Sequence, residues 1–156
     1  MDLFEKEIIL FFKHLCQQNV EFILVGGLAV NYHGFNRATG DVDIWINESI
    51  DNRKKFVSAL TNYGIDGSEI YLTLPLIAGY SELMLDNGIR IDLMSALQFF
   101  NQDNFEDCFK SANDFELAET VTIKVLHINT LIQEKEQSQR PKDKIDADVL
   151  KKLYRN

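Results

Sequence analysis

The stretch that most restricts how this chain can fold is 23–47, ILVGGLAVNYHGFNRATGDVDIWIN. One apolar run ends at Gly26 and Gly27, and the next begins with Asp41 and Asp43 on either side of a valine. Residues two apart on a strand share a face, so the two carboxylates project together about 6.6 Å apart along the chain. At about 5 Å and an effective dielectric near 20, two such charges repel by ~3 kcal/mol. The pair therefore requires either protonation of one carboxyl or a cation bound between them.

A third acid has the same apolar surroundings. Asp92 lies in IRIDLM, on the second strand of a hairpin expected over 81–95 with its turn at 86–88. If that strand pairs beside 42–46, Asp92 reaches the same place. Three carboxylates with no His or Cys nearby suit Mg²⁺, or Mn²⁺, rather than Zn²⁺. Two such ions, about 3.5–4 Å apart, could hold the entering and leaving oxygens of a phosphoryl displacement. An isolated Asp of this kind would instead be a strand-end residue facing solvent.

The hydrophobic pattern predicts an α+β fold, in which a mixed sheet carries helices and a short helical segment follows it. We expect a single domain over 1–156, with a core at about 20–128 and a C-terminal helical segment at about 129–156. The expected helices are 2–18, 28–34, about 49–62 (capped by Asn47 or Ser49 and ended by Gly64), about 103–110, 129–139 and 142–156. The expected strands are 21–25, 42–46, two β-rich stretches at 69–77 and 81–95, and one short strand within 116–128.

Composition excludes several classes of protein. The 156 residues carry 24 acidic and 16 basic side chains, a formal net charge of −8, which argues against a protein that coats nucleic acid. The apolar runs are shorter than the roughly 20 residues needed to cross a bilayer, and the N-terminus does not resemble a signal peptide. Cys16 and Cys108 are isolated, as expected for reduced thiols. We expect a cytoplasmic protein that does not associate with membranes.

The glycine pair Gly26–Gly27 follows a strand and opens a helix. Backbone N–H groups freed at such a point can bind an anion, and a phosphate approaches closely because no Cβ intervenes. The pair alone is more often only a turn, and neither GxxxxGK[ST] nor GxGxxG is present. The order of features is more specific: strand, Gly-Gly, helix, Arg and Thr, an acid-apolar-acid strand, and a later acid on another strand.

These motifs resemble a known group of proteins. VGG, thirteen residues, DVDI and a later IDL are similar to the hG[GS]…Dh[DE]h…h[DE]h pattern of the DNA polymerase β-like nucleotidyltransferase superfamily, where h is apolar. More narrowly, GGLAVNYHGFNRATGDVDIWI and the tail LIQEKEQSQRPKDKIDADVL resemble small bacterial nucleotidyltransferases related to lincosamide resistance enzymes and to toxin–antitoxin nucleotidyltransferases. The resemblance spans 22 to 150 and implies a nucleotidyltransferase fold.

The resemblance implies a role for each motif residue. Asp41 and Asp43 would bind the Mg²⁺ ions that hold a nucleoside triphosphate. Asp92 would hold the catalytic ion and help to deprotonate the attacking hydroxyl. Gly26 and Gly27 would cradle the phosphates. The implied reaction is in-line attack of a hydroxyl on the α-phosphorus with release of pyrophosphate, catalysed mostly by positioning and charge neutralisation.

The chain departs from the pattern after the glycines, where many superfamily members have Ser and this sequence has Leu28. Arg37 and Thr39, just before the acidic strand, are the best candidates to supply the missing phosphate contact. Lys135 or Lys142 could neutralise the β- and γ-phosphates, although both could equally belong to a solvated helix face.

Two further polar residues have a structural interpretation beside a functional one. Asp143 could cap the last helix and have no chemical role. His33, in the short helix after the glycines, is more readily explained as a packing residue than as a substrate or phosphate contact.

The leading hypothesis is a Mg²⁺-dependent nucleotidyltransferase that moves a nucleoside monophosphate from an NTP to a hydroxyl. The acceptor would be a small molecule such as an antibiotic, or a protein side chain, since the net acidity argues against an RNA end. The alternative is a non-catalytic or weakly catalytic member of a toxin–antitoxin pair that acts by protein binding. The presence of all three acids favours catalysis. Expected partners beyond the NTP and its acceptor are a second copy of the chain or a small helical protein.

Overall fold

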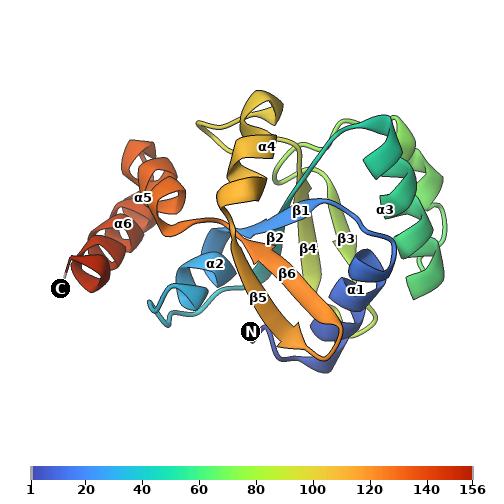
Figure 1. The fold of residues 1–156 in the computed structure, drawn as a ribbon, viewed down its shortest axis with the longest axis horizontal. Coiled ribbons are helices and arrows are strands. Elements are labelled where there is room, and N and C mark those ends of the chain that lie inside the picture. Colours follow the sequence, from blue (N-terminus) through green and yellow to red (C-terminus); the bar gives the residue numbers. More distant parts are fainter. Residues whose placement is uncertain (1, 156) are drawn as a thin grey trace.

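The computed structural model describes residues 2–155 as six strands and six α-helices with one 3₁₀ helix (Figure 1). The helices are α1 (Lys6–Gln17), α2 (Gly26–Tyr32), α3 (Ile50–Tyr63), η1 (Ser68–Leu72), α4 (Gln102–Ser111), α5 (Ile128–Gln137) and α6 (Pro141–Tyr154). The strands are β1 (Phe22–Val25), β2 (Asp41–Ile46), β3 (Glu82–Met84), β4 (Arg90–Met94), β5 (Asn113–Ala118) and β6 (Val121–Val125). The expected α+β class, with a mixed sheet flanked by helices, is confirmed.

The strands form one sheet in the order β3-β4-β2-β1-β6-β5. β2 is antiparallel to β1 and parallel to β4, and β1 is parallel to β6. The outer strands β3 and β5 each pair antiparallel with the neighbour to which a hairpin joins them. β1 is buried on both faces, as its all-apolar sequence FILV requires.

Helices cover the sheet unevenly. α1 and α3 pack against each other on one side of the molecule, while α5 and α6 form a pair at the opposite end, where the chain finishes (Figure 1). The largest fully buried side chains include Phe11 and Phe12 of α1, Trp45 of β2 and Phe56 of α3. Among residues 2–155, no helix is long and apolar enough to cross a membrane.

Several local predictions are confirmed. Ser49, one of the two expected caps, accepts a hydrogen bond from the backbone N of Asn52 at 3.2 Å and so begins α3. Gly64 ends that helix in the left-handed conformation, with φ of +112°. The hairpin over 81–95 turns at Gly88, which has φ of +85° and donates to the carbonyl of Leu85.

The strand expected at 69–77 is wrong. This stretch contains η1 and irregular turns, and most of its side chains are exposed. The guanidinium of Arg53 takes up two of its backbone acceptors, donating to the carbonyls of Tyr71 and Leu74 at 2.9 Å each. Pro75 has no N–H to donate to a strand partner. The apolar residues that predicted a strand therefore belong to an irregular surface segment.

The prediction for 116–128 was incomplete, because this part of the chain forms the hairpin β5–β6 rather than a single strand. Its turn passes through Thr120, a non-glycine residue at φ of +62°. No Gly, Asn or Pro marks this turn, and β5 carries acids in its sequence NDFELA, so the sequence lacked the usual signals for a hairpin.

Candidate functional site: an acidic cleft at the centre of the sheet

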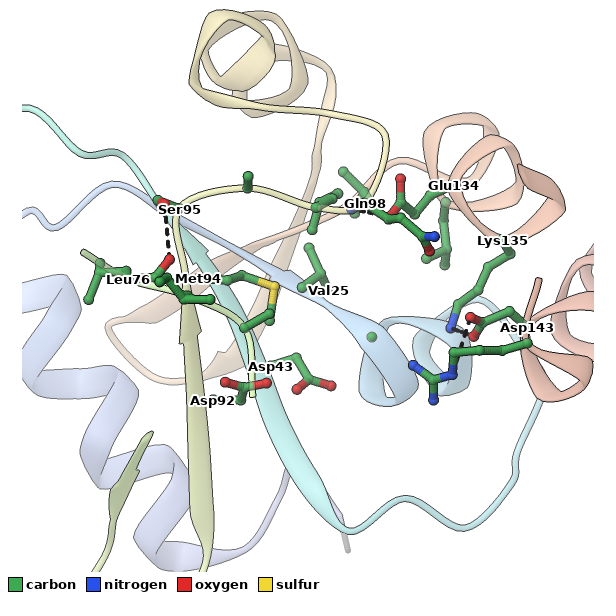
Figure 2. Close-up of a pocket in the computed structure, with 18 residues that line it drawn as sticks. Val25, Asp43, Leu76, Asp92, Met94, Ser95, Gln98, Glu134, Lys135 and Asp143 are labelled. Atoms are coloured by element: carbon green, nitrogen blue, oxygen red, sulfur yellow. Dashed lines mark hydrogen bonds and ion pairs between the residues drawn. The ribbon is translucent and has the colours of Figure 1, made fainter. Parts of the chain in front are cut away.

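Asp43 and Asp92 lie side by side at the centre of the sheet. The parallel register of β2 and β4 pairs their Cα positions directly, which confirms the expectation that the strand carrying Asp92 runs beside 42–46. Both residues line a cavity of about 480 Å³. Figure 2 shows the two carboxylates close together on one side of this cavity, with Lys135 and Asp143 across from them. The topology thus brings together two acids that are 49 positions apart in the sequence.

Asp41, the third acid, begins β2 and is exposed. It pairs in register with Arg90 of β4 and shares a strand face with Asp43. Among residues 2–155, the cavity wall includes Asp43 and Asp92 but not Asp41. Asp43 and Asp92 therefore lie side by side in the cavity wall, and Asp41 lies outside that wall at the exposed end of β2.

The carboxylates of this cleft repel one another. Burial raises the pKa of Asp43 to about 6, and the charges of Asp92 and Asp41 add to the shift, while Lys135 opposes it. Burial also raises the pKa of Asp92, opposed by a hydrogen bond from the backbone N–H of Gly79. The cleft therefore carries acidic groups that favour a cation or a proton, chiefly because they are buried and secondarily because they lie near one another.

Both glycines of the Gly-Gly pair are needed for close packing. A Cβ on Gly26, which has φ of +66°, would lie 2.1 Å from Oδ2 of Asp43. A Cβ on Gly27 would lie 2.5 Å from Oγ1 of Thr39 and 3.3 Å from Nη1 of Arg37. Gly26 also lines the cavity. The glycine pair therefore lets Asp43 of β2 and the segment 37–39 approach the start of α2. Gly26 also exposes backbone to the cleft beside Asp43.

Arg37 and Lys135, both partly buried, pair with two buried aspartates in an ion network that joins the core to the C-terminal helices. The Arg37 guanidinium donates to both carboxylate oxygens of Asp146, at 2.7 Å each. Lys135 Nζ lies 2.8 Å from Asp143 Oδ1 and 3.2 Å from Asp146 Oδ2. Although burial opposes it, hydrogen bonds from Lys135 and Ser138 lower the pKa of Asp143. The structure thus places Asp143 in an ion pair rather than in a helix cap.

The other predicted residues lie away from the cleft. Lys142 is exposed on α6, and His33 is buried beneath the same helix. Nε2 of His33 donates to the carbonyl of Leu126 at 2.7 Å, so Nδ1 is free to accept from the hydroxyl of Tyr154 at 3.1 Å. Burial lowers the pKa of His33, which keeps the ring neutral. Its position agrees with the packing interpretation.

Sequence reasoning missed the residues that form the far rim of the cavity. Glu134 of α5 lines it and accepts hydrogen bonds from the backbone N of Gln98 at 2.6 Å and of Phe99 at 3.0 Å. Burial raises the pKa of Glu134. The only sequence signal was its position next to Lys135. The rest of the wall is largely apolar and includes Leu76, Ile77, Ala78, Met94, Leu97 and Leu131.

The donor set of the cleft fits a magnesium ion that arrives with a phosphate ligand. Among residues 2–155, no three or more His, Cys, Asp or Glu side chains are grouped closely enough to form a metal site on their own. Mg²⁺ is commonly bound through only one or two carboxylates together with substrate phosphates. The hard oxygens of Asp43 and Asp92 match that preference, and the cavity beside them leaves room for a phosphate ligand.

The chain was also compared with known proteins. Neither protein-family models nor curated protein sequences yield a match. The fold and the site define an α+β protein with an acidic cleft, and the function proposed for it depends on the geometry of that cleft and on its motifs.

Proposed function

We propose that the protein is a Mg²⁺-dependent nucleotidyltransferase of the DNA polymerase β-like type, which transfers a nucleoside monophosphate from an NTP to an acceptor hydroxyl. The observation that carries this proposal is the register pairing of Asp43 with Asp92 at the wall of a cavity that also contains Gly26 and Lys135. Two neighbouring acids whose pKa values are both raised favour a positive counter-charge, and the divalent cations that accompany a triphosphate would supply one.

Each residue has a defined part in the reaction. Asp43, with Asp41 two residues before it on β2, would hold the cations of the triphosphate in the cavity that Gly26 also lines. The acceptor oxygen attacks the α-phosphorus, the bond from that phosphorus to the bridging oxygen breaks, and pyrophosphate leaves. Asp92 would hold the catalytic cation and accept the proton of the acceptor hydroxyl. Bound Mg²⁺ would neutralise the charge that develops on the phosphoryl oxygens.

Lys135 is the cation best placed for the outer phosphates. It lies on the cavity wall, and its charge already lowers the pKa of Asp43. Asp143 and Asp146 fix its position, so a triphosphate would meet an ammonium group that is already oriented. Arg37, by contrast, donates to both carboxylate oxygens of Asp146. It therefore stabilises the structure around the cleft and would not contact the phosphates.

The proposal is tested by thermal unfolding with ATP, GTP, CTP or UTP, with and without Mg²⁺. A nucleotide at about 100 times its Kd should add about 2.7 kcal/mol of stability. We expect a rise that requires Mg²⁺ and that Asp43→Asn abolishes. Asp148→Asn, which removes an exposed carboxylate of α6, is the matched control and should leave the rise unchanged.

A binding role is the second candidate, because Lys135 and Arg140, the cations that line the cleft, are both already paired with Asp143. A nucleotidyltransferase fold that had become a member of a toxin–antitoxin pair would not need free cations. If none of the four nucleotides raises the unfolding temperature, the catalytic proposal is wrong and the protein-binding role is favoured.

A further inference from the structure

A tight turn over 77–81 lies directly against Asp92. Its last residue, Ser81, is buried, accepts a hydrogen bond at Oγ from the backbone N of Ile77 and donates to the carbonyl of Pro75. The backbone N of Leu93, the residue after Asp92, donates to the carbonyl of Ser81 at 2.8 Å. These bonds fix the turn to β4 on the side of Asp92 away from Asp43.

The contact with Asp92 is made by the backbone of Gly79. Its N–H donates to both carboxylate oxygens, at 3.0 Å to Oδ1 and 3.2 Å to Oδ2. Gly79 has φ of +80°, and among the described residues no atom lies within 4 Å of the place where a Cβ would be. Glycine is therefore favoured here by backbone conformation rather than by space.

We propose that Gly79 is a positioning residue that holds the Asp92 carboxylate facing the cleft, ready to bind a divalent cation. The inference rests on the proposed function, since it assigns Asp92 the metal-binding role. A backbone amide suits this task because it carries no net charge. It orients the carboxylate and leaves each oxygen a lone pair for a metal ion, whereas a Lys or Arg would neutralise it.

The same turn connects this carboxylate to the wall of the cavity. Ile77 and Ala78, the residues before Gly79, both line the cleft. Asp92 is only partly buried, so without this donor its side chain would adopt several rotamers, and binding a metal would have to restrict them again. Restricting Asp92 in advance lowers that entropic cost.

The test compares two substitutions that differ in their tolerance of positive φ. Asn adopts the left-handed conformation readily and a β-branched residue does not. Gly79→Asn keeps the N–H in place, whereas Gly79→Val forces the turn to rearrange. The measurement is Mn²⁺ affinity by electron paramagnetic resonance, with Mn²⁺ alone as the probe.

We expect Gly79→Asn to bind Mn²⁺ like the unmodified protein and Gly79→Val to bind it about tenfold more weakly, the order of effect of one hydrogen bond to a charged group. Gly67→Val is the matched control, because Gly67 has φ of +74° and an open Cβ position in a different turn. It should suffer similar backbone strain and keep its Mn²⁺ affinity. Equal affinity of the two Gly79 variants, or an equal loss in Gly67→Val, would overturn the inference.

A measurement without metal completes the test. In ¹H–¹⁵N spectra, the Gly79 amide proton should move upfield in Asp92→Asn, because a charged acceptor is replaced by a neutral one, and it should respond less to Asp43→Asn. An amide that ignores Asp92→Asn would overturn the inference. If the hydrogen bond is present but the unmodified protein binds no Mn²⁺, the metal-binding function fails and the role of Gly79 fails with it. If Mn²⁺ binds but the Gly79 variants are equal, only the role of Gly79 fails.

Discussion

The protein contains two pairs of buried or partly buried aspartates whose environments are opposite. Asp43 and Asp92, on neighbouring strands, face one cavity and have raised pKa values. Asp143 and Asp146, on α6, are surrounded by cations, and hydrogen bonding overcomes burial to lower the pKa of Asp143. The C-terminal pair is thus neutralised by the chain itself, whereas the strand pair is not. Uncompensated negative charge at the centre of a sheet marks a candidate site for a ligand that brings positive charge.

The neutralised pair is broken most severely by Asp146→Ala. This change leaves the largely buried Arg37 side chain without its bidentate partner and removes one of the two carboxylates that hold Lys135. Loss of one partner of a buried ion pair typically costs about 3–5 kcal/mol, so we expect a loss of that order in the free energy of unfolding. Urea denaturation measures it, and Asp148→Ala, at an exposed position of the same helix, should change little.

A double variant separates the ion pair from the packing around it. Arg37→Met with Asp146→Leu removes both charges together, and such replacements are often neutral or stabilising. We expect it to recover most of the stability that Asp146→Ala loses. If the double variant is as unstable as Asp146→Ala, the loss arises from packing of α6 and not from an unpaired charge.

The strand pair was predictable from the sequence because its signals are local and periodic. Alternation fixes which residues of DVDIWI share a face, and the apolar residues around Asp92 mark a second buried strand. Parallel pairing of these two strands then brings Asp43 and Asp92 into register. Only Asp41 differs from the simplest expectation, because as the first residue of β2 it lies at the exposed end of that strand.

The C-terminal pair was not predictable in the same way. Asp146 meets Arg37 across 109 positions of sequence, and no periodicity reports such a contact. The sequence therefore left Arg37 as a phosphate ligand and Asp143 as a helix cap. The segment before the Gly79 turn was mispredicted for another reason: the apolar residues of 69–77 resembled a strand, while hydrogen bonds from Arg53 to Leu74 and from Ser81 to Pro75 determine its actual shape.

In the strand pair, Asp43 and Asp92, removal of a charge is expected to raise the free energy of unfolding rather than lower it. Because the pKa of Asp43 is raised from 3.8 to about 6, the folded state holds a proton that the unfolded state releases between about pH 4 and 6. Stability therefore falls as pH rises through that window. Asp43→Asn removes this loss, so we expect it to be more stable than the unmodified protein at pH 7 by about 1–3 kcal/mol and nearly equal at pH 4.

Urea unfolding at pH 4, 5, 6 and 7 in the absence of divalent cations measures this difference. The effect should shrink when Mg²⁺ and a bound nucleotide are added, because these stabilise only the protein that retains Asp43. A variant that is less stable than the unmodified protein at pH 7 would show that Asp43 is already balanced within the chain, and the contrast between the two aspartate pairs would disappear.

The smallest expected effect comes from Tyr154→Phe, which sharpens the comparison by testing a neutral contact between the same two parts of the molecule. The Tyr154 hydroxyl donates to Nδ1 of His33, the residue that follows α2, so α6 is joined to the end of α2 by a neutral hydrogen bond as well as to Arg37 by an ionic one. Because Tyr154 is half exposed, we expect a loss near about 0.5 kcal/mol, the low end for a hydrogen bond. Urea unfolding with and without 1 M NaCl provides the measurement, since salt at roughly that concentration screens charges beyond about 3 Å. The difference caused by Tyr154→Phe should be independent of salt; a difference as large as that of Asp146→Ala would show that α6 is held chiefly by its end and not by its buried charges.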